Sequence, residues 1–125
     1  MTFKDELNKT VVSVRETVKR KASVAFSNAL KSAMETAASQ GKTSGETSID
    51  SEIEYDDETN YVEIYEKLEE ILIIEGLIKD KSNDKLNVYK WLLEDVQKTD
   101  VFKDIFFNID DNNDYWLKFH WCLDD

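Results

Sequence analysis

Proline is absent from this sequence of 125 residues, and glycine, cysteine and histidine are scarce, with three, one and one. A chain with so few turn-forming residues favours long regular elements over a loop-rich architecture. One cysteine cannot form an intrachain disulfide, which fits a reducing compartment, and we therefore expect a cytoplasmic protein.

Long apolar runs are missing as well. The longest unbroken run covers residues 71–74, far short of the roughly 20 residues that span a bilayer. Residues 1–5 contain no apolar stretch of the kind found in signal peptides. We expect a soluble globular protein without membrane contact, and the length favours a single domain over residues 1–125.

The charge of the chain is uneven. Residues 50–75 carry eleven carboxylates and one cation, Lys67. Residues 1–31 carry seven Lys or Arg and three acids, a local charge of +4; since the whole chain has a charge of −11, the remaining residues hold −15. Such a field repels nucleic acids and anionic membranes and attracts basic surfaces. We therefore expect a basic protein partner and no direct contact with nucleic acid.

Residues 2–40 have the pattern of a long helix. Thr2 and Asp5 form a predicted capping box, and Gly41 stands where a left-handed C-cap belongs. Apolar residues at helical spacing form a set that we call the apolar stripe: Phe3, Leu7, Val11, Val14 and Val18. One helix of this length measures roughly 55 Å, more than the diameter of a small domain. Either it bends or breaks near Ala22-Ser23, or its N-terminal half, about residues 1–22, projects.

The continuation of this helix is rich in alanine. Ala22, Ala25, Ala29, Ala33 and Ala37 recur at helical spacing and allow close approach of another helix. The stripe of alanines predicts either packing in the monomer core or a helix–helix dimer seam.

The rest of the chain predicts an α+β fold. Residues 42–46 form a connector, and residues 47–55 alternate like a half-buried strand, with Ile49, Ile53 and Tyr55 on one side. Helices are expected from Asn60 to Gly76 and over residues 85–98. Two further strands, 105–109 and 115–123, form a hairpin around a turn at 110–114. We expect a three-stranded antiparallel sheet with the helices packed on the face that carries Phe119.

The acidic residues are the main candidate for a binding site. Carboxylates spaced about 6.6 Å apart on one strand face, continued on the next helix, can imitate the charge of a phosphate backbone or meet any basic partner. The exposed aromatic residue of the last strand adds an anchor. The predicted partner-binding residues are Asp50, Glu52, Glu54, Asp56, Asp57, Glu63, Glu66, Glu70 and Trp116. The alternative interpretation is a solvated face that only keeps the protein soluble.

Catalytic and metal sites are not predicted. His120 and Cys122 share a strand face, but they are the only histidine and cysteine in the chain. A catalytic pair would lack an orienting group, and a metal site would need further ligands. We therefore expect no enzyme, no catalytic residues, no metal and no cofactor.

Two functions follow from these observations. The first is a non-enzymatic, acidic protein–protein interaction module, such as an inhibitor encoded by a phage or another mobile element that mimics nucleic-acid charge. The alternative is a small structural or assembly subunit that forms a homodimer through its N-terminal helix.

Overall fold

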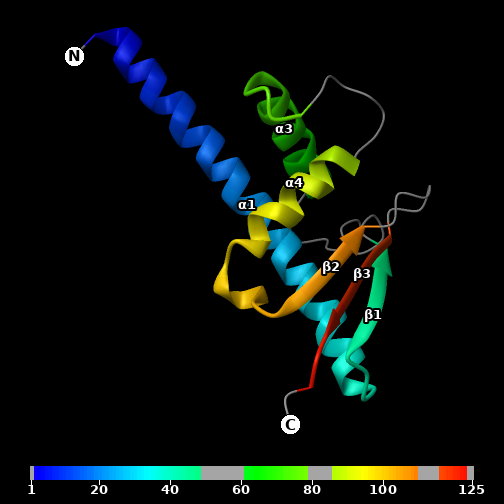
Figure 1. The fold of residues 1–125 in the computed structure, drawn as a ribbon. Coiled ribbons are helices and arrows are strands. Elements are labelled where there is room, and N and C mark those ends of the chain that lie inside the picture. The colour runs from blue at the N-terminus through cyan, green and yellow to red at the C-terminus, as the bar shows by residue number, and fades with distance from the viewer. Residues whose placement is uncertain (1, 49–60, 79–85, 110–115, 124–125) are drawn as a thin grey trace.

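The computed structural model describes residues 2–48, 61–78, 86–109 and 116–123. Within these ranges the fold is α+β, as predicted, with three α-helices and a three-stranded sheet (Figure 1). The elements are α1 (Phe3–Ser39), β1 (Ser44–Ser48), α3 (Tyr61–Ile74), α4 (Leu86–Gln97), the 3-10 helix η1 (Asp100–Phe102), β2 (Ile105–Ile109) and β3 (Trp116–Trp121). The predicted turn at 110–114 lies outside the described residues.

Helix α1 begins and ends where its capping residues predict. The Asp5 backbone N–H donates to Thr2 Oγ1 at 3.2 Å, and the Thr2 N–H donates to Asp5 Oδ2 at 3.3 Å, which completes the capping box. At the other end Gly41 has a φ of 76°. The N–H of Lys42 then bonds the carbonyl of Ala37 at 3.0 Å, as in a Schellman motif.

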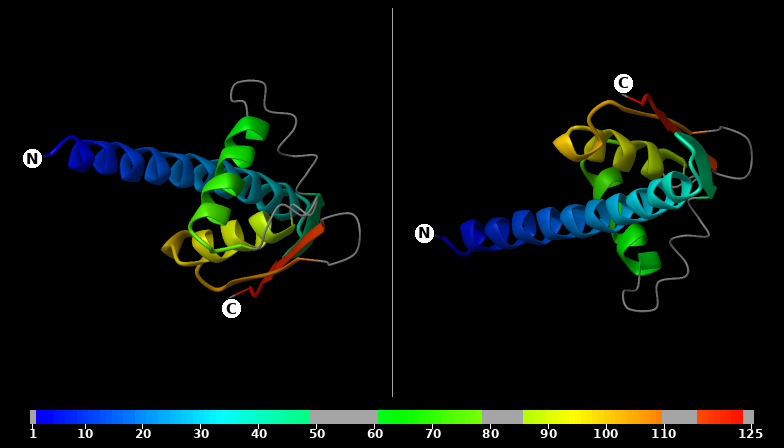
Figure 2. Two further views of the ribbon diagram at one scale, coloured as in Figure 1. Left: turned by 90° about the horizontal axis from the view of Figure 1, so that it is seen from above. Right: turned by 90° about the horizontal axis from the view of Figure 1, so that it is seen from below.

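Between these caps α1 is one unbroken helix that passes through Ala22 and Ser23. Its first half extends away from the other elements, and its second half lies along the sheet and the other helices (Figures 1 and 2). The β-branched residues in the first half weaken a helix. Two of them, Thr10 and Thr17, also donate their hydroxyls to the carbonyls four residues before them, and this back-bonding slightly destabilises a helix as well.

The sheet is antiparallel with the order β1-β3-β2, so β3 is the central strand. The predicted hairpin strands are confirmed as β2 and β3. The start of β1 is a correction: it begins at Ser44, inside the segment 42–46 that the sequence predicts to be a connector. Gly45 pairs with Phe119 across the sheet, and a Cβ on Gly45 would lie 2.9 Å from the Phe119 ring. Because the Phe119 ring leaves no room for a side chain, this position requires glycine. Residues 49–55 of the predicted strand lie outside the described residues.

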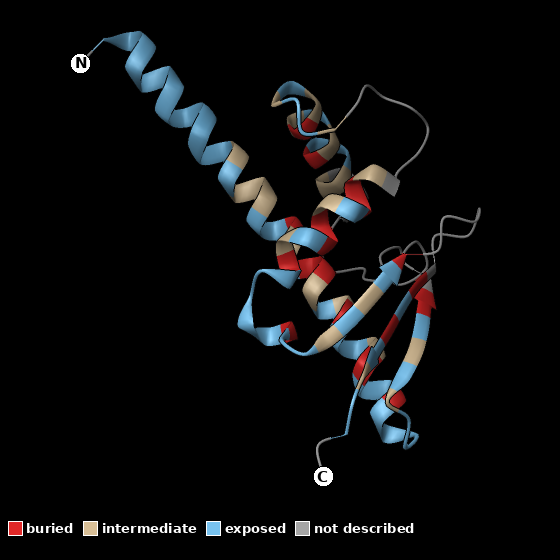
Figure 3. Ribbon diagram, viewed as in Figure 1, coloured by how far each residue is buried: buried red, intermediate tan, exposed pale blue. Residues whose placement is uncertain are grey.

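The core joins the second half of α1 to α3, α4 and one face of the sheet (Figure 3). Phe119 and Leu117 of β3 are buried, while Lys118 and His120 between them are exposed, which confirms the predicted strand faces. The described core residues are Ala22, Phe26, Leu30, Met34, Ala37, Leu68, Leu72, Val88, Tyr89, Leu92, Leu93, Val96, Phe102, Ile109, Leu117 and Phe119. Packing in the monomer core is thus shown for Ala22 and Ala37 of the alanine stripe.

The predicted helices 60–76 and 85–98 are confirmed as α3 and α4. Helix α3 ends in a second Schellman arrangement, in which Gly76 has a φ of 73° and the Leu77 N–H bonds the Leu72 carbonyl at 2.9 Å. No helix among the described residues is long and apolar enough to cross a membrane.

Candidate functional site

The first half of α1 presents an uncovered apolar surface. Residues 2–14, which we call the arm, are all exposed. The exposed fractions of the first four members of the apolar stripe are Phe3 73%, Leu7 50%, Val11 43% and Val14 53%. Their spacing of four, four and three residues places them along one side of the helix. A stripe of this kind is normally buried against another element, and within the described residues no element covers it (Figure 3).

The base of the arm is fixed to α3 by charge. Glu75, just after α3, accepts a hydrogen bond from Lys19 Nζ at 2.7 Å and lies 3.8 Å from Arg15 Nη1. All three side chains are partly shielded from solvent, so these contacts are screened less than fully exposed pairs. Val18, between the two cations, packs against the core. Two cations of the basic segment 1–31 thus pair with one carboxylate of the acidic segment 50–75 within one chain.

The predicted acidic site is described only in part. Asp50, Glu52, Glu54, Asp56 and Asp57 lie outside the described residues, as do the side chains of Glu63 and Trp116. Glu66 and Glu70 are exposed on α3. The structure therefore places two of the predicted residues on the same helix and leaves the strand-borne carboxylates as a prediction.

The outer face of the sheet carries an aromatic contact that the sequence does not predict. Phe106 of β2 is 54% exposed, and its ring stacks on His120 of β3 with centroids 5.0 Å apart. The contact arises because these two residues are direct cross-strand partners. The only sequence signal for it is the hairpin register.

Cys122 is exposed with a free thiol, and the described residues hold no group of three or more His, Cys, Asp or Glu that could bind a metal ion.

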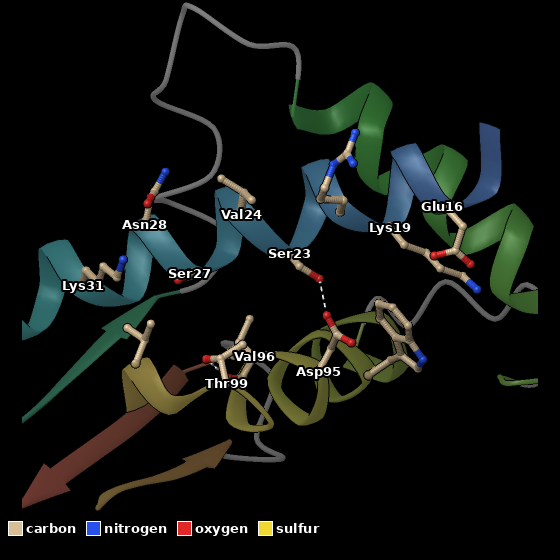
Figure 4. A pocket seen from close by; sticks show the side chains of 13 residues that line it. Glu16, Lys19, Ser23, Val24, Ser27, Asn28, Lys31, Asp95, Val96 and Thr99 are labelled. Atoms are coloured by element: carbon tan, nitrogen blue, oxygen red, sulfur yellow. Dashed lines mark hydrogen bonds between the residues drawn. The ribbon is translucent and has the colours of Figure 1, made fainter. Parts of the chain in front are cut away.

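A groove of about 590 Å³ runs between α1 and α4 (Figure 4). In it Ser23 donates its hydroxyl to Asp95 Oδ2 at 2.6 Å, a bond that ties the two helices together. The lining mixes both signs of charge: its acids are Glu16 and Asp95, and its cations are Lys19, Arg20 and Lys31. Its described lining contains no histidine, so the Ser–Asp pair lacks the base of a catalytic triad. The groove therefore shows a structural contact between α1 and α4.

Comparison of the chain with protein-family models, with curated proteins and with solved structures finds no match in any of the three. The arm, its base and the charge distribution are the features of the molecule that bear on its function.

Proposed function

We propose that this protein is a non-enzymatic assembly protein that associates with a second copy of itself through the arm. The observation that carries the proposal is the set of four exposed apolar side chains at helical spacing on a projecting helix. An ordered set of exposed apolar side chains like this one is typical of an interaction site.

The helical state of the arm is a second argument. Isolated helices shorter than about 12–15 residues are marginal in water, and most helical stability in proteins comes from tertiary packing of an amphipathic face. The arm has thirteen residues, among them Thr10, Val11, Val12 and Val14, whose β-branched side chains favour a helix less than alanine or leucine does. Contact with another helix would supply the missing support.

The energetics favour a weak, reversible dimer. Fully burying a Val, Leu or Phe side chain contributes about 1.5–3 kcal/mol. The stripe residues are already partly covered by their own helix, so about 1 kcal/mol each is the relevant gain. Two arms with four such residues give about 8 kcal/mol, against an association cost of roughly 4–15 kcal/mol. At the low end of that cost about 4 kcal/mol remains, which corresponds to a dissociation constant of about 1 mM.

The first test replaces Val11 with Gln. Gln has a higher helix propensity than Val, so the change removes apolar surface without weakening the helix. Each dimer contains two altered sites, so we expect a loss of about 2 kcal/mol, which is roughly 30-fold in Kd. Sedimentation equilibrium from about 1 µM to 1 mM covers binding free energies of roughly −8 to −4 kcal/mol.

The matched control is Val12→Gln. Val12 is 59% exposed and is also on the arm, but its side chain is rotated by about 100° from that of Val11. This variant should associate like the unaltered protein. If both variants change the Kd equally, or if the unaltered protein is monomeric up to 1 mM, the stripe does not mediate self-association.

A second proposal is the acidic interaction module. It is supported by the charge of −15 outside residues 1–31 and by the exposure of Glu66 and Glu70 on α3. The basic partner would be attracted by the field of the acidic residues, with mimicry of nucleic-acid charge as its specific form.

A further inference from the structure

Strand β2 forms one edge of the sheet. In the order β1-β3-β2, β3 is the only strand beside it among the described residues. An edge strand leaves alternate backbone N–H and C=O groups without a partner strand, and natural proteins protect such edges with charged residues, proline or a covering element. The sequence of β2, Ile-Phe-Phe-Asn-Ile, contains neither a charge nor proline, whereas the other edge strand, β1, carries Glu46. Strand β2 is therefore the less protected edge.

The outward side chains of β2 are available for contact. Phe106 and Asn108 are both exposed. The Phe106 ring stacks on His120 of β3, with an angle of 19° between the ring planes. His120 thus covers the ring face that is turned toward β3. The opposite ring face is turned toward the open edge, where a side chain of an added strand would stand at a distance of roughly 5 Å.

We propose that β2 receives an extended segment of a basic partner protein as a fourth strand, with an arginine or lysine of that segment on the free face of the Phe106 ring. This inference rests on the proposal of an acidic interaction module. A cation fits that ring face because the π electrons of an aromatic ring attract it. The charge of −11 on the chain also draws basic segments toward it.

The contact needs only the backbone edge of β2 and its exposed side chains. The inward residues Ile105, Phe107 and Ile109 remain packed in the core of their own chain. In strand addition the backbone hydrogen bonds supply affinity, and alternate side chains supply specificity. Successive side chains of a strand point to opposite faces, so the cations of the segment should stand at every second position, beside Phe106 and Asn108. The recognised chemistry is therefore an extended segment in which Arg or Lys alternates with apolar residues.

The probe is a peptide of about eight residues in which Arg and Val alternate. Two N-methylated versions, one methylated on the Arg amides and one on the Val amides, separate strand addition from attraction by charge. Only alternate N–H groups of an added strand face the neighbouring strand. One version should therefore bind like the parent peptide, and the other about 10-fold more weakly. Attraction by charge alone predicts equal binding of both. Titration calorimetry with the full-length protein gives the three Kd values.

Lysine substitutions on the two edges locate the contact. Phe106 and Ser44 are both exposed cross-strand partners of His120, one from β2 and one from β1. Phe106→Lys and Ser44→Lys therefore add the same charge to the same face of the sheet. Phe106→Lys should weaken binding of the parent peptide about 10-fold, because it removes the ring and repels cations. Ser44→Lys should weaken it about 2-fold at most. Thermal unfolding checks that both variants are folded.

Unequal binding of the two methylated peptides, together with the larger loss in Phe106→Lys, supports the proposal. Equal binding of the methylated peptides, or equal losses in the two lysine variants, overturns it and leaves the acidic interaction module intact. A larger loss in Ser44→Lys also overturns it, because the added strand then lies on β1. If the parent peptide does not bind at about 1 mM in low salt, the strand addition and the acidic module are both wrong.

Discussion

At the scale of single residues, the two faces of the sheet should respond very differently to the same substitution. Phe119 is 3% exposed and belongs to the core, whereas Phe106 is 54% exposed and lies on the outer face of the neighbouring strand. Truncating a buried Phe costs roughly 3–5 kcal/mol, a large part of the total stability of about 5–15 kcal/mol. Phe119→Ala should therefore unfold the protein or strongly lower its Tm.

The matched control is Phe106→Ala, which removes only a cross-strand contact with His120. Such pairs contribute roughly 0.2–1 kcal/mol, so its Tm should shift by a few degrees at most. Thermal unfolding followed by circular dichroism compares the two. If Phe106→Ala is the more destabilising change, the core lies on the opposite face from the one assigned here.

The faces of β3 could be predicted because they depend only on the alternation of residues 116–121. The role of Gly45 could not. It is needed because Phe119, more than seventy residues later, places its ring where a side chain on β1 would stand. The Ser23–Asp95 bond and the Phe106–His120 stack could not be predicted for the same reason. Each joins residues of two different elements that are brought together only by the tertiary fold.

At the scale of elements, α1 should be divisible into a removable arm and an essential remainder. A variant that begins at Ser13 loses residues 2–12 of the arm, which are all exposed, and Ser13 with Glu16 offers a new capping box at the shortened end. Its Tm should match that of the full chain, while its self-association should be lost. Thermal unfolding and light scattering give both quantities.

A variant that begins at Ser23 is the contrasting case. It also removes Val18, Ala22 and the Lys19–Glu75 bond, all of which contact the rest of the protein. We expect a loss of about 2 kcal/mol, which lowers Tm by roughly 10 °C in a domain of this size. Equal stability of the two shortened proteins would show that the base of the arm adds nothing to the core.

Elements with strong local signals were predictable, whereas the start of β1, which depends on pairing with β3, was not. The capping box, the helical spacing of apolar residues and Gly41 together identify α1 at both ends. Strand β1 has the sequence Ser-Gly-Glu-Thr-Ser, which shows no alternation of large apolar and polar residues. The strand conformation of β1 comes from its hydrogen bonds to β3. The Trp121 N–H adds one more bond, to the Thr43 carbonyl at 2.9 Å. Because nothing in the local sequence signals this pairing, the predicted start of the strand is three residues too late.

At the scale of the whole molecule, the exposed apolar stripe and most of the negative charge belong to different parts of the sequence. The arm offers an apolar stripe, and its base carries cations that Glu75 partly neutralises. Most of the negative charge follows later in the sequence. A protein organised in this way can associate with itself through the arm and still attract a basic partner through its acidic residues, so the two proposed functions are compatible.

If the acidic residues form a binding site, the affinity for a basic partner should depend on which carboxylates are removed as well as on the net charge. Asp50→Asn/Glu52→Gln/Glu54→Gln removes three charges from the densest acidic segment of the sequence. Binding to a poly-lysine peptide should weaken about 10-fold and become less sensitive to salt, because closely spaced charges act together on a basic chain. Titration calorimetry at two or more ionic strengths gives the affinity and its salt dependence.

The matched control removes the same charge elsewhere, as Glu35→Gln/Glu46→Gln/Glu94→Gln. These three carboxylates are exposed on α1, β1 and α4, and none belongs to the predicted binding residues. Both variants have the same net charge, so a generic acidic surface loses equal affinity in both. A dedicated acidic site loses affinity mainly in the variant at residues 50–54. Equal losses would identify the acidic residues as a solvating surface and leave self-association through the arm as the one proposed function.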